Sequence, residues 1–256
     1  MGSALIRGAL DSGIIKADRV SAYDIRKEAL TKICRENKIR AASSNIDAVE
    51  KSDFIFICVK PQQMKKLLLE IRESLRSKQC LISIAAGVRT HEIEAFFPVH
   101  LPLIRVMPNT PALIRCGVTA ITQGRFASRL HLQFAIDFFS AVGKVVVLPE
   151  KHFDAVTAIS GSGPAYIFYL AESFQRACKM LGLPRSASEI LFKQTLVGSG
   201  KMLMNSVSPT ELRQSVTSPG GTTESAIRYL ESKSWLETFI QAIKKARDRS
   251  KELKIK

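Results

Sequence analysis

Long apolar segments are missing from this chain of 256 residues. No apolar run approaches the roughly 18 residues that a membrane-spanning helix needs. The first residues also lack the layout of a signal peptide, because Arg7 and Asp11 interrupt the apolar stretch. Ile6 stands where an N-myristoylation motif requires Ser or Thr. We therefore expect the protein to have no membrane partner.

Cysteine and histidine are too few and too scattered to indicate a metal site. The five cysteines form no Cys-x-x-Cys pair, and the four histidines lie equally far apart. An odd, dispersed set of thiols in a chain of this size fits reduced cysteines in the cytoplasm. The sequence therefore predicts a cytoplasmic protein without a metal ion. The cysteines are Cys34, Cys58, Cys80, Cys116 and Cys178.

Acidic residues are scarce beside basic ones, with 23 Asp and Glu against 38 Lys and Arg, which gives a net charge of +15. Much of the excess lies after Lys244, but no aromatic residue follows Phe239. Single-strand nucleic-acid sites combine basic residues with aromatic stacking. We therefore favour a solvated basic helix face and expect no nucleic-acid partner. The remaining charge could steer anionic ligands toward a cleft.

The first 149 residues alternate short β-type runs with helical patterns. This alternation predicts βαβ units, a parallel sheet and ligands bound beyond the carboxyl ends of the strands. The run at 54–59 is continuously apolar, as expected for a strand covered on both faces. The expected strands are 19–23, 54–59, 80–85, 103–107 and 144–148, and the expected helices are 26–35, 62–75 and 127–142.

The composition changes after Pro149. From Glu150 onward only helical patterns are found, with breaks expected at 161–164, 182–184, 208–209 and 219–221. Long apolar helices in such a tail suggest an all-α domain that could bury surface against a second copy. The predicted domains are therefore 1–149 and 150–256.

The stretch from Val216 to Ile227 crowds hydroxyls, two glycines and a proline into the lead-in to a helix expected at 223–230. Pro219 fixes one φ angle, and Gly220-Gly221 allows bare N–H groups to turn toward a ligand. Unpaired N–H groups and the positive end of a helix suit a small carboxylate. The alternative is an ordinary capped helix after a Gly-Gly turn.

Two further loops follow expected strands. Lys60-Pro61 could let the backbone approach a nicotinamide or a ribose, or it could simply open a helix. The loop 107–111 encloses Asn109 and Thr110 between two prolines, so it could project them into a cleft or merely turn the chain. Neither loop decides a function alone.

Two glycine-containing segments imitate nucleotide motifs without satisfying them. The segment 161–164, Gly-Ser-Gly-Pro, is no dinucleotide fingerprint because no strand precedes it. The segment 198–201, Gly-Ser-Gly-Lys, lacks the glycine spacing of a phosphate loop and lies inside a helical pattern.

Taken together, Val59-Lys60-Pro61, the loop 107–111, the segment 159–166 and the stretch 216–227 resemble pyrroline-5-carboxylate reductases in order and spacing. The resemblance runs from Met1 to about Leu253. It implies a Rossmann-like α/β domain followed by an all-α dimerisation domain. It also implies NAD(P)H-dependent reduction of 1-pyrroline-5-carboxylate to L-proline, the last step of proline biosynthesis, by a homodimer or a ring of dimers such as a homodecamer.

The resemblance also implies the site residues. Thr223 matches the position beside the ring nitrogen of the substrate, where its hydroxyl would orient the ring or relay a proton. The substrate carboxylate would be surrounded by Ser218, Gly221, Thr222 and Thr223. Glu150 matches an acidic position near the substrate, although it could instead cap the helix after Pro149. The cofactor would contact Gly2, Asp24, Asn45, Cys58, Val59, Lys60, Pro61, Ile84, Ala85 and Ala86.

The chain departs from the family at its start. Members begin with a strand and a Gly-x-Gly-x-Met-Gly/Ala turn, and Met1-Gly2 looks like the last two residues of that turn. We expect that the missing strand and glycines would weaken dinucleotide binding. An alternative function is therefore a catalytically impaired dimerising homologue.

The cofactor preference rests on residues 23–27. Asp24 could accept hydrogen bonds from a free 2′-hydroxyl and favour NADH, whereas Arg26 and Lys27 could pair with a 2′-phosphate. We expect NADPH, with NADH possible. A related reductase of β-hydroxyacids is a weaker alternative, because Lys193 and Lys201 lack a Gly-x-x-Gly-x-x-x-Lys context.

Overall fold

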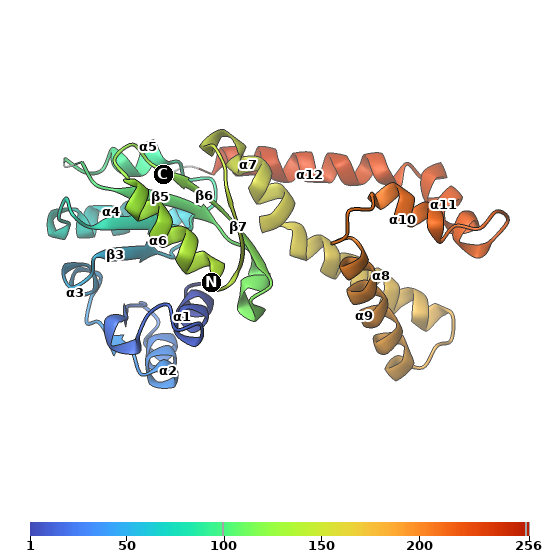
Figure 1. The fold of residues 1–256 in the computed structure, drawn as a ribbon, viewed down its shortest axis with the longest axis horizontal. Helices are drawn as coiled ribbons and strands as arrows, with labels where there is room; N and C mark the ends of the chain where they lie inside the picture. Colours follow the sequence, from blue (N-terminus) through green and yellow to red (C-terminus); the bar gives the residue numbers. More distant parts are fainter. Residues whose placement is uncertain (99, 254, 256) are drawn as a thin grey trace. The chain divides into compact units, whose positions relative to one another are not determined.

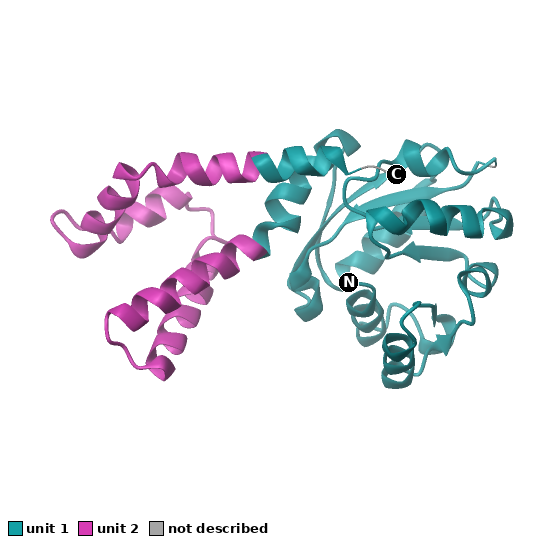
Figure 2. Cartoon of the chain, turned by 180° about the vertical axis from the view of Figure 1, so that it is seen from behind, with its two compact units in different colours: residues 1–164, 245–256 teal, residues 165–244 magenta. Residues whose placement is uncertain are grey.

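The computed structural model describes residues 1–98, 100–253 and 255. The chain divides into two compact units, which are residues 1–164 with 245–256 (unit 1) and residues 165–244 (unit 2). Figure 2 colours the two units separately. Helix α12 (Trp235–Glu252) begins in unit 2 and ends in unit 1. The boundary predicted at residue 149 stays a prediction; it marks the place where strands stop and helices take over.

Unit 1 is built on a five-stranded sheet (Figure 1). Its order is β3 (Phe54–Ile57), β4 (Cys80–Ser83), β5 (Leu103–Met107), β6 (Gly117–Gln123) and β7 (Gly143–Val147). The predicted parallel sheet is confirmed except at one pair of strands, because β6 runs antiparallel to β5. Residues 108–116 join these strands, which is too short for a crossover helix, so the chain returns antiparallel. Strand β6 itself was not predicted.

A separate two-stranded parallel sheet pairs β1 (Ser21–Ala22) with β2 (Arg40–Ala41). The prediction of a strand at 19–23 was too long, and β2 was not predicted. Helix α2 (Lys27–Asn37) connects the two strands, as a parallel pair requires. A 3₁₀ turn, η1 (Ala17–Arg19), precedes β1.

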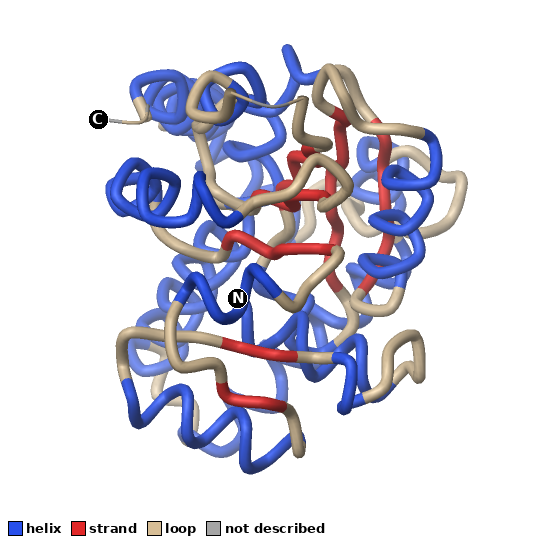
Figure 3. Tube along the Cα trace, turned by 90° about the vertical axis from the view of Figure 1, so that its left-hand side faces the viewer, coloured by secondary structure: helices blue, strands red, loops and turns tan. Residues whose placement is uncertain are grey.

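Helix α1 (Gly2–Asp11) packs against both sheets. Leu5 and Ala9 belong to the core of the five-stranded sheet, whereas Ile6 and Leu10 contact the apolar cluster beside β1 and β2. Figure 3 shows the start of the chain between the two sheets. The helix therefore joins the two parts of unit 1 through its apolar faces.

Helices cover both faces of the five-stranded sheet. Ile82 of β4 faces the cluster that contains α6 (Arg129–Ser140), and its neighbour Leu81 faces the cluster that contains α4 (Pro61–Ile71) and α5 (Thr90–Glu94). Successive side chains of a strand point to opposite faces, so a strand covered twice is apolar throughout. The same holds for the run predicted at 54–59: in β3, Phe54 and Phe56 pack against the cluster that contains α6, and Ile55 and Ile57 against the other, so that prediction is confirmed. Helix α3 (Asn45–Glu50) and the 3₁₀ turns η2 (Arg72–Ser74) and η3 (Thr110–Ile114) complete this part.

The helical region starts with η4 (Glu150–His152) and α7 (Phe153–Val156). The predicted break at 161–164 is confirmed but short, because a π-helical turn at Thr157–Gly161 ends there and α8 (Gly163–Met180) begins after Ser162. The amide of Ser162 donates to the carbonyl of Thr157 at 2.8 Å, which is the wide hydrogen bond of a π-turn. Pro164 is tolerated because the first turn of a helix needs no N–H donor at that place.

Unit 2 is entirely helical in its described residues. The predicted breaks at 182–184, 208–209 and 219–221 are confirmed by the ends of α8, α9 (Arg185–Met202), α10 (Pro209–Ser215) and α11 (Thr222–Ser232). Gly182 adopts φ +76° after α8, and Ser208 caps α10. The imitation phosphate loop at 198–201 lies within α9, as predicted.

Apolar side chains of unit 2 remain largely uncovered. Among the described residues of α8, α9, α10 and α11, Ser188 alone is buried. Exposed side chains include Phe168, Tyr169, Phe174, Ile190, Leu191 and Leu236. None of the described helices is both long enough and apolar enough to cross a membrane.

Candidate active site

Two loops after neighbouring parallel strands lie side by side in unit 1. Ile57 of β3 pairs with Ser83 of β4, and the amide of Ile84 donates to the carbonyl of Ile57 at 3.2 Å. Residues 58–61 and 84–86 therefore leave the same edge of the sheet together. Seven predicted cofactor residues come from these loops: Cys58, Val59, Lys60, Pro61, Ile84, Ala85 and Ala86.

The start of α1 lies beside the first of these loops. A Cβ atom added to Gly2 would be 3.5 Å from both the Cβ and Sγ atoms of Cys58. The carbonyl of Met1 accepts from the amides of Ala4 and Leu5, at 2.8 and 3.1 Å. The amides of Gly2 and Ser3 precede this hydrogen-bond ladder, so they present donors at the positive end of the helix. These donors suit a pyrophosphate, and the residues present fit a dinucleotide at this edge.

Lys60 and Pro61 open helix α4. Lys60 is the exposed N-cap residue and Pro61 is the first helical residue. The prediction that Lys60-Pro61 opens a helix is thus confirmed, since proline suits the first helical position. Contact with a cofactor stays a prediction for both residues.

The carboxylate of Asp24 is engaged by Arg26. The Nε and Nη2 atoms of Arg26 lie 3.3 and 3.2 Å from the two carboxylate oxygens, and the Arg26 amide donates at 2.9 Å. The guanidinium of Arg26 thereby lowers the pKa of Asp24. Asp24 and Arg26, which favour different cofactors in the sequence, therefore form one exposed ion pair after β1.

Asn45 starts α3, and its side-chain amide donates to both carboxylate oxygens of Glu70 at 3.1 and 3.0 Å. The side chain thereby links α3 to α4. A role of Asn45 toward a cofactor stays a prediction.

The loop after β4 is held at Gly87. This glycine has φ +76°, and an added Cβ would lie 2.7 Å from the carbonyl oxygens of Ser250 and Leu253. The hydroxyl of Ser250 donates to Asp154 at 2.8 Å. The end of α12 therefore packs directly against the loop that contains Ala85 and Ala86, and only glycine fits there.

Glu150 lies in a network with Thr90 and Arg105. Its Oε1 atom accepts from the Thr90 amide at 2.8 Å and from Nη1 of Arg105 at 2.9 Å, and its Oε2 atom accepts from the Thr90 hydroxyl at 2.9 Å. Burial alone would raise the pKa of Glu150, but the Thr90 amide, the Arg105 guanidinium and the Thr90 hydroxyl together lower it. The carboxylate is therefore charged and its oxygens are occupied.

Sequence reasoning missed Thr90 and Arg105. A usable signal was present, because Arg105 is a charged residue inside the apolar strand Leu103–Met107. A buried guanidinium requires a partner, so its position in that strand indicates a buried ion pair. The identity of the partner, 45 residues away, could not be inferred from the sequence.

The loop after β5 packs inward. Asn109 is buried, and its Oδ1 atom accepts from the Val118 amide at 3.0 Å. A Cβ added to Gly161 would lie 2.5 Å from the Cε atom of Met107. Asn109 therefore turns the chain, which is the second of the two alternatives for this loop, and Gly161 packs closely against Met107.

The four predicted substrate residues 218 and 221–223 form one turn in unit 2. The Gly221 amide donates to the Ser218 carbonyl at 3.0 Å, with Pro219 and Gly220 between them. Gly220 has φ +70°, as the third residue of a type II turn requires. Gly221 is the N-cap of α11, so this helix starts at Thr222, one residue earlier than predicted.

The start of α11 has no side-chain cap in the described structure. The amides of Thr222, Thr223 and Glu224 precede its hydrogen-bond ladder, which begins when Ser225 donates to Gly221. The Glu224 carboxylate folds back to accept from the Gly220 amide at 2.6 Å, and Arg228 pairs with it at 2.8 Å. The turn thus leaves backbone donors at the positive end of an 11-residue helix.

Comparison with known proteins gives the family. The family model for pyrroline-5-carboxylate reductase dimerisation matches residues 150–253, and the model for coenzyme F420-dependent NADP oxidoreductase matches residues 1–87. A pyrroline-5-carboxylate reductase of Methanosarcina acetivorans is 36% identical, with 99% of this chain and 94% of that protein covered. One of Pseudomonas aeruginosa is 39% identical, with 99% and 93% covered. The chain belongs to the pyrroline-5-carboxylate reductase family.

Solved structures of this family agree with the fold. The pyrroline carboxylate reductase of Plasmodium falciparum, solved with NADP bound, has a TM-score of 0.91 and 32% identity, with 99% of this chain and 94% of that one covered. The enzyme of Coxiella burnetii has a TM-score of 0.88 and 34% identity, with the same coverage. The predicted Rossmann-like domain followed by a helical dimerisation domain is confirmed.

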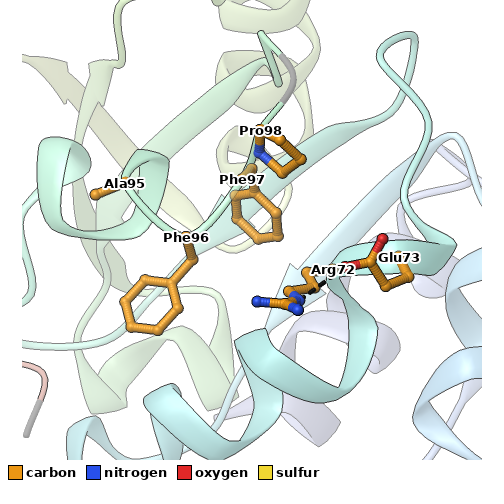
Figure 4. A pocket seen from close by; sticks show the side chains of 6 residues that line it. All are labelled: Arg72, Glu73, Ala95, Phe96, Phe97 and Pro98. Atoms are coloured by element: carbon orange, nitrogen blue, oxygen red, sulfur yellow. Dashed lines mark ion pairs between the residues drawn. The ribbon is translucent and has the colours of Figure 1, made fainter.

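A pocket in unit 1 lies away from these loops. It has a volume of about 410 Å³ and is lined by Arg72, Glu73, Ala95, Phe96, Phe97 and Pro98 (Figure 4). These residues precede β4 and β5, so the pocket lies at the amino ends of the strands. Ligands of such folds bind at the carboxyl ends, so this pocket is not the reductase site.

Proposed function

We propose that this chain reduces 1-pyrroline-5-carboxylate to L-proline, the last step of proline biosynthesis. Full-length similarity to the named reductases supports the reaction. The single structural observation that carries the proposal is the type II turn that opens α11 with uncapped backbone donors. Such donors at a helix N-terminus suit the carboxylate of the substrate.

We assign the substrate carboxylate to Ser218, Gly221, Thr222 and Thr223. The hydroxyl of Thr223 would orient the ring nitrogen or supply its proton, because reduction leaves that nitrogen protonated. The reaction needs positioning, exclusion of water and one donor rather than a nucleophile. Glu150, which the resemblance also gives as a substrate residue, lies in unit 1 and contacts Thr90 and Arg105 there.

The bound NAD(P)H would supply the hydride. The amides at the start of α1 would hold its pyrophosphate, and the loops 58–61 and 84–86 would border the nicotinamide half. Asp24 and Asn45 would lie on the adenosine side. We favour NADPH, because Arg26 neutralises Asp24 and leaves an exposed guanidinium for a 2′-phosphate.

The helical part would join two copies of the chain, since its residues match the dimerisation model and its apolar side chains are uncovered. We extend this proposal to a ring of dimers such as a homodecamer. A cytoplasmic location agrees with five free cysteines.

The test is NADPH oxidation with 1-pyrroline-5-carboxylate, with L-proline measured as the product. Thr223→Ala should lower kcat roughly tenfold or more, as for the loss of one positioned donor. Thr238→Ala, which removes an exposed threonine of α12, is the matched control and should leave kcat unchanged. An unchanged kcat in Thr223→Ala would remove this residue from the mechanism, and absence of L-proline would reject the function.

A further inference from the structure

Glu150 connects three elements of unit 1 that are far apart in the sequence. It begins η4, and it accepts hydrogen bonds from Thr90 at the start of α5 and from Arg105 in β5. Thr90 and Glu150 are separated by 60 residues. The carboxylate therefore joins the loop after β4, the strand before the loop 108–116, and the first turn of the helical region.

Arg105 fixes the position of this carboxylate. The side chain of Arg105 is only 3% exposed, and its guanidinium lies 4.8 Å from the centre of the Phe153 ring. Its ion-pair partner is Glu150, at 2.9 Å. A buried guanidinium without a partner is strongly unfavourable, so the pair resists rearrangement. Glu150 thus has little freedom to turn toward a ligand.

The carboxylate in turn fixes the start of α5. The amide of Thr90 is one of the unpaired donors of that helix, and Glu150 caps it while also accepting from the Thr90 hydroxyl. The loop Ile84–Arg89 therefore has fixed ends at Ser83 of β4 and at Thr90. Its middle packs closely at Gly87 against the backbone carbonyls of Ser250 and Leu253.

Direct contact between Glu150 and the substrate fits these contacts less well. Three donors already occupy its oxygens, and Arg105 neutralises its charge. A carboxylate offers about four acceptor positions, so little capacity is left.

We propose that Glu150 is a positioning residue for the dinucleotide, which acts through Thr90 to hold the loop Ile84–Arg89 in its binding conformation. The inference rests on the proposed function, because it takes Ile84, Ala85 and Ala86 to border the cofactor. Arg105 holds the Glu150 carboxylate in place, and Thr90 connects that carboxylate to the loop Ile84–Arg89.

The experiment measures three quantities for each variant: the Kd of NADPH without substrate by fluorescence, the Michaelis constant for the pyrroline substrate at saturating NADPH, and hydrogen exchange of residues 84–90. Glu150→Gln keeps the shape but loses the charge and one acceptor. Thr90→Val removes only the hydroxyl. The double variant Arg105→Met with Glu150→Gln removes both charges, so it tests the idea if the single variant fails to fold.

Glu94→Gln is the matched control. The Glu94 carboxylate also accepts a loop amide, that of Arg125 at 2.8 Å, which belongs to a different loop from Ile84–Arg89. We expect the NADPH Kd of Glu150→Gln and of the double variant to rise roughly tenfold, as for one lost charge-assisted hydrogen bond. Thr90→Val should raise it less, exchange at 84–90 should accelerate, and the Michaelis constant for the substrate should stay within about twofold.

Two results would overturn the inference. A raised Michaelis constant for the substrate with an unchanged NADPH Kd would place Glu150 at the substrate. Unchanged NADPH binding and unchanged exchange in all three variants would mean that the network does not position the loop. If the unmodified protein binds NADPH but forms no L-proline, the proposed function fails, whereas the binding and exchange data still decide this inference.

Discussion

Helices α4 and α8 show how differently the two units use apolar residues. In α4 the side chains of Met64 and Leu68 are fully buried in the core of unit 1. In α8 the aromatic residues Phe168 and Tyr169 are 61% and 71% exposed. Both helices have an apolar stripe in the sequence, so the pattern predicts that a face will be covered but does not tell what covers it.

This difference in burial suggests that the two units are stabilised in different ways. Unit 1 has its own core between a sheet and its helices, so its stability comes from burial within the chain. Unit 2 buries one residue in its four helices α8 to α11, among the residues described. An exposed apolar surface of this extent marks an interaction site, which is the role the family model gives this part.

The largest expected effect comes from the core of unit 1. Leu68→Ala should lower the free energy of unfolding by about 2–5 kcal/mol, because it leaves a cavity in a packed core. Leu69→Ala, at the neighbouring and 46% exposed residue, should change it by only about 0.5 kcal/mol. Urea denaturation at a fixed protein concentration compares the two. Equal losses would show that burial in α4 does not control stability.

Self-association of the chain should be weakened by a substitution in unit 2 instead. Phe168→Glu should raise the dissociation constant of the homo-oligomer at least tenfold, since losing a central aromatic residue typically costs about 2 kcal/mol. Sedimentation velocity over a range of concentrations measures this constant. Leu69→Glu adds the same charge to an exposed apolar position of unit 1 and serves as the control. Loss of association in the control alone would place the interface on unit 1.

Much of the fold followed from apolar patterns where burial is local. The continuous apolar run at 54–59 predicted β3 and the apolar stripe at 62–75 predicted α4, because each element is covered on the faces that its pattern requires. Strand β6, Gly117–Gln123, was missed because its threonines and glycine dilute that pattern. The two-residue strands β1 and β2 are too short to leave any periodicity.

The candidate site was predictable only in part. Loops after strands and the turn before α11 could be placed because proline and glycine restrict the backbone there. The network of Thr90, Arg105 and Glu150 could not, because hydrogen bonds between residues 45 and 60 positions apart leave no local pattern. The family resemblance supplied Glu150 as a site residue, and the structure supplied its partners.

Glycines with positive φ occur in both units and should differ in what an alanine costs there. Gly13 of unit 1 and Gly220 of unit 2 have φ +74° and +70° and no atom within 4 Å of an added Cβ. Alanine at either place should cost about 1–2 kcal/mol of unfolding free energy, from backbone strain alone. Gly87→Ala should cost more, because its Cβ would meet two carbonyl oxygens at 2.7 Å. Denaturant unfolding of the three variants measures the order, and an equal cost at Gly87 would contradict the close packing of α12.

The smallest expected effect is the loss of two helix caps, those of α6 and α10, at different pH values. In α6 of unit 1, Nδ1 of His131 accepts from the Ser128 amide at 3.0 Å, and in α10 of unit 2, Oε2 of Glu211 accepts from the Ser208 amide at 3.0 Å. Burial lowers the pKa of His131, and the hydroxyl and amide of Ser208 lower the pKa of Glu211. Each group thus binds fewer protons when folded, so its contribution is present above its unfolded pKa and is lost as the pH falls.

The two caps should therefore fail at different pH values. The start of α6 should lose protection from hydrogen exchange as the pH falls below about 6.5, and the start of α10 only below about 4.3. The accompanying change in melting temperature near pH 6 should be less than about 2 °C. His131→Gln keeps an acceptor at the same position of the capping box but cannot titrate there, so its α6 should stay protected down to about pH 5. Unchanged fraying of α6 in this variant would show that another group causes the loss.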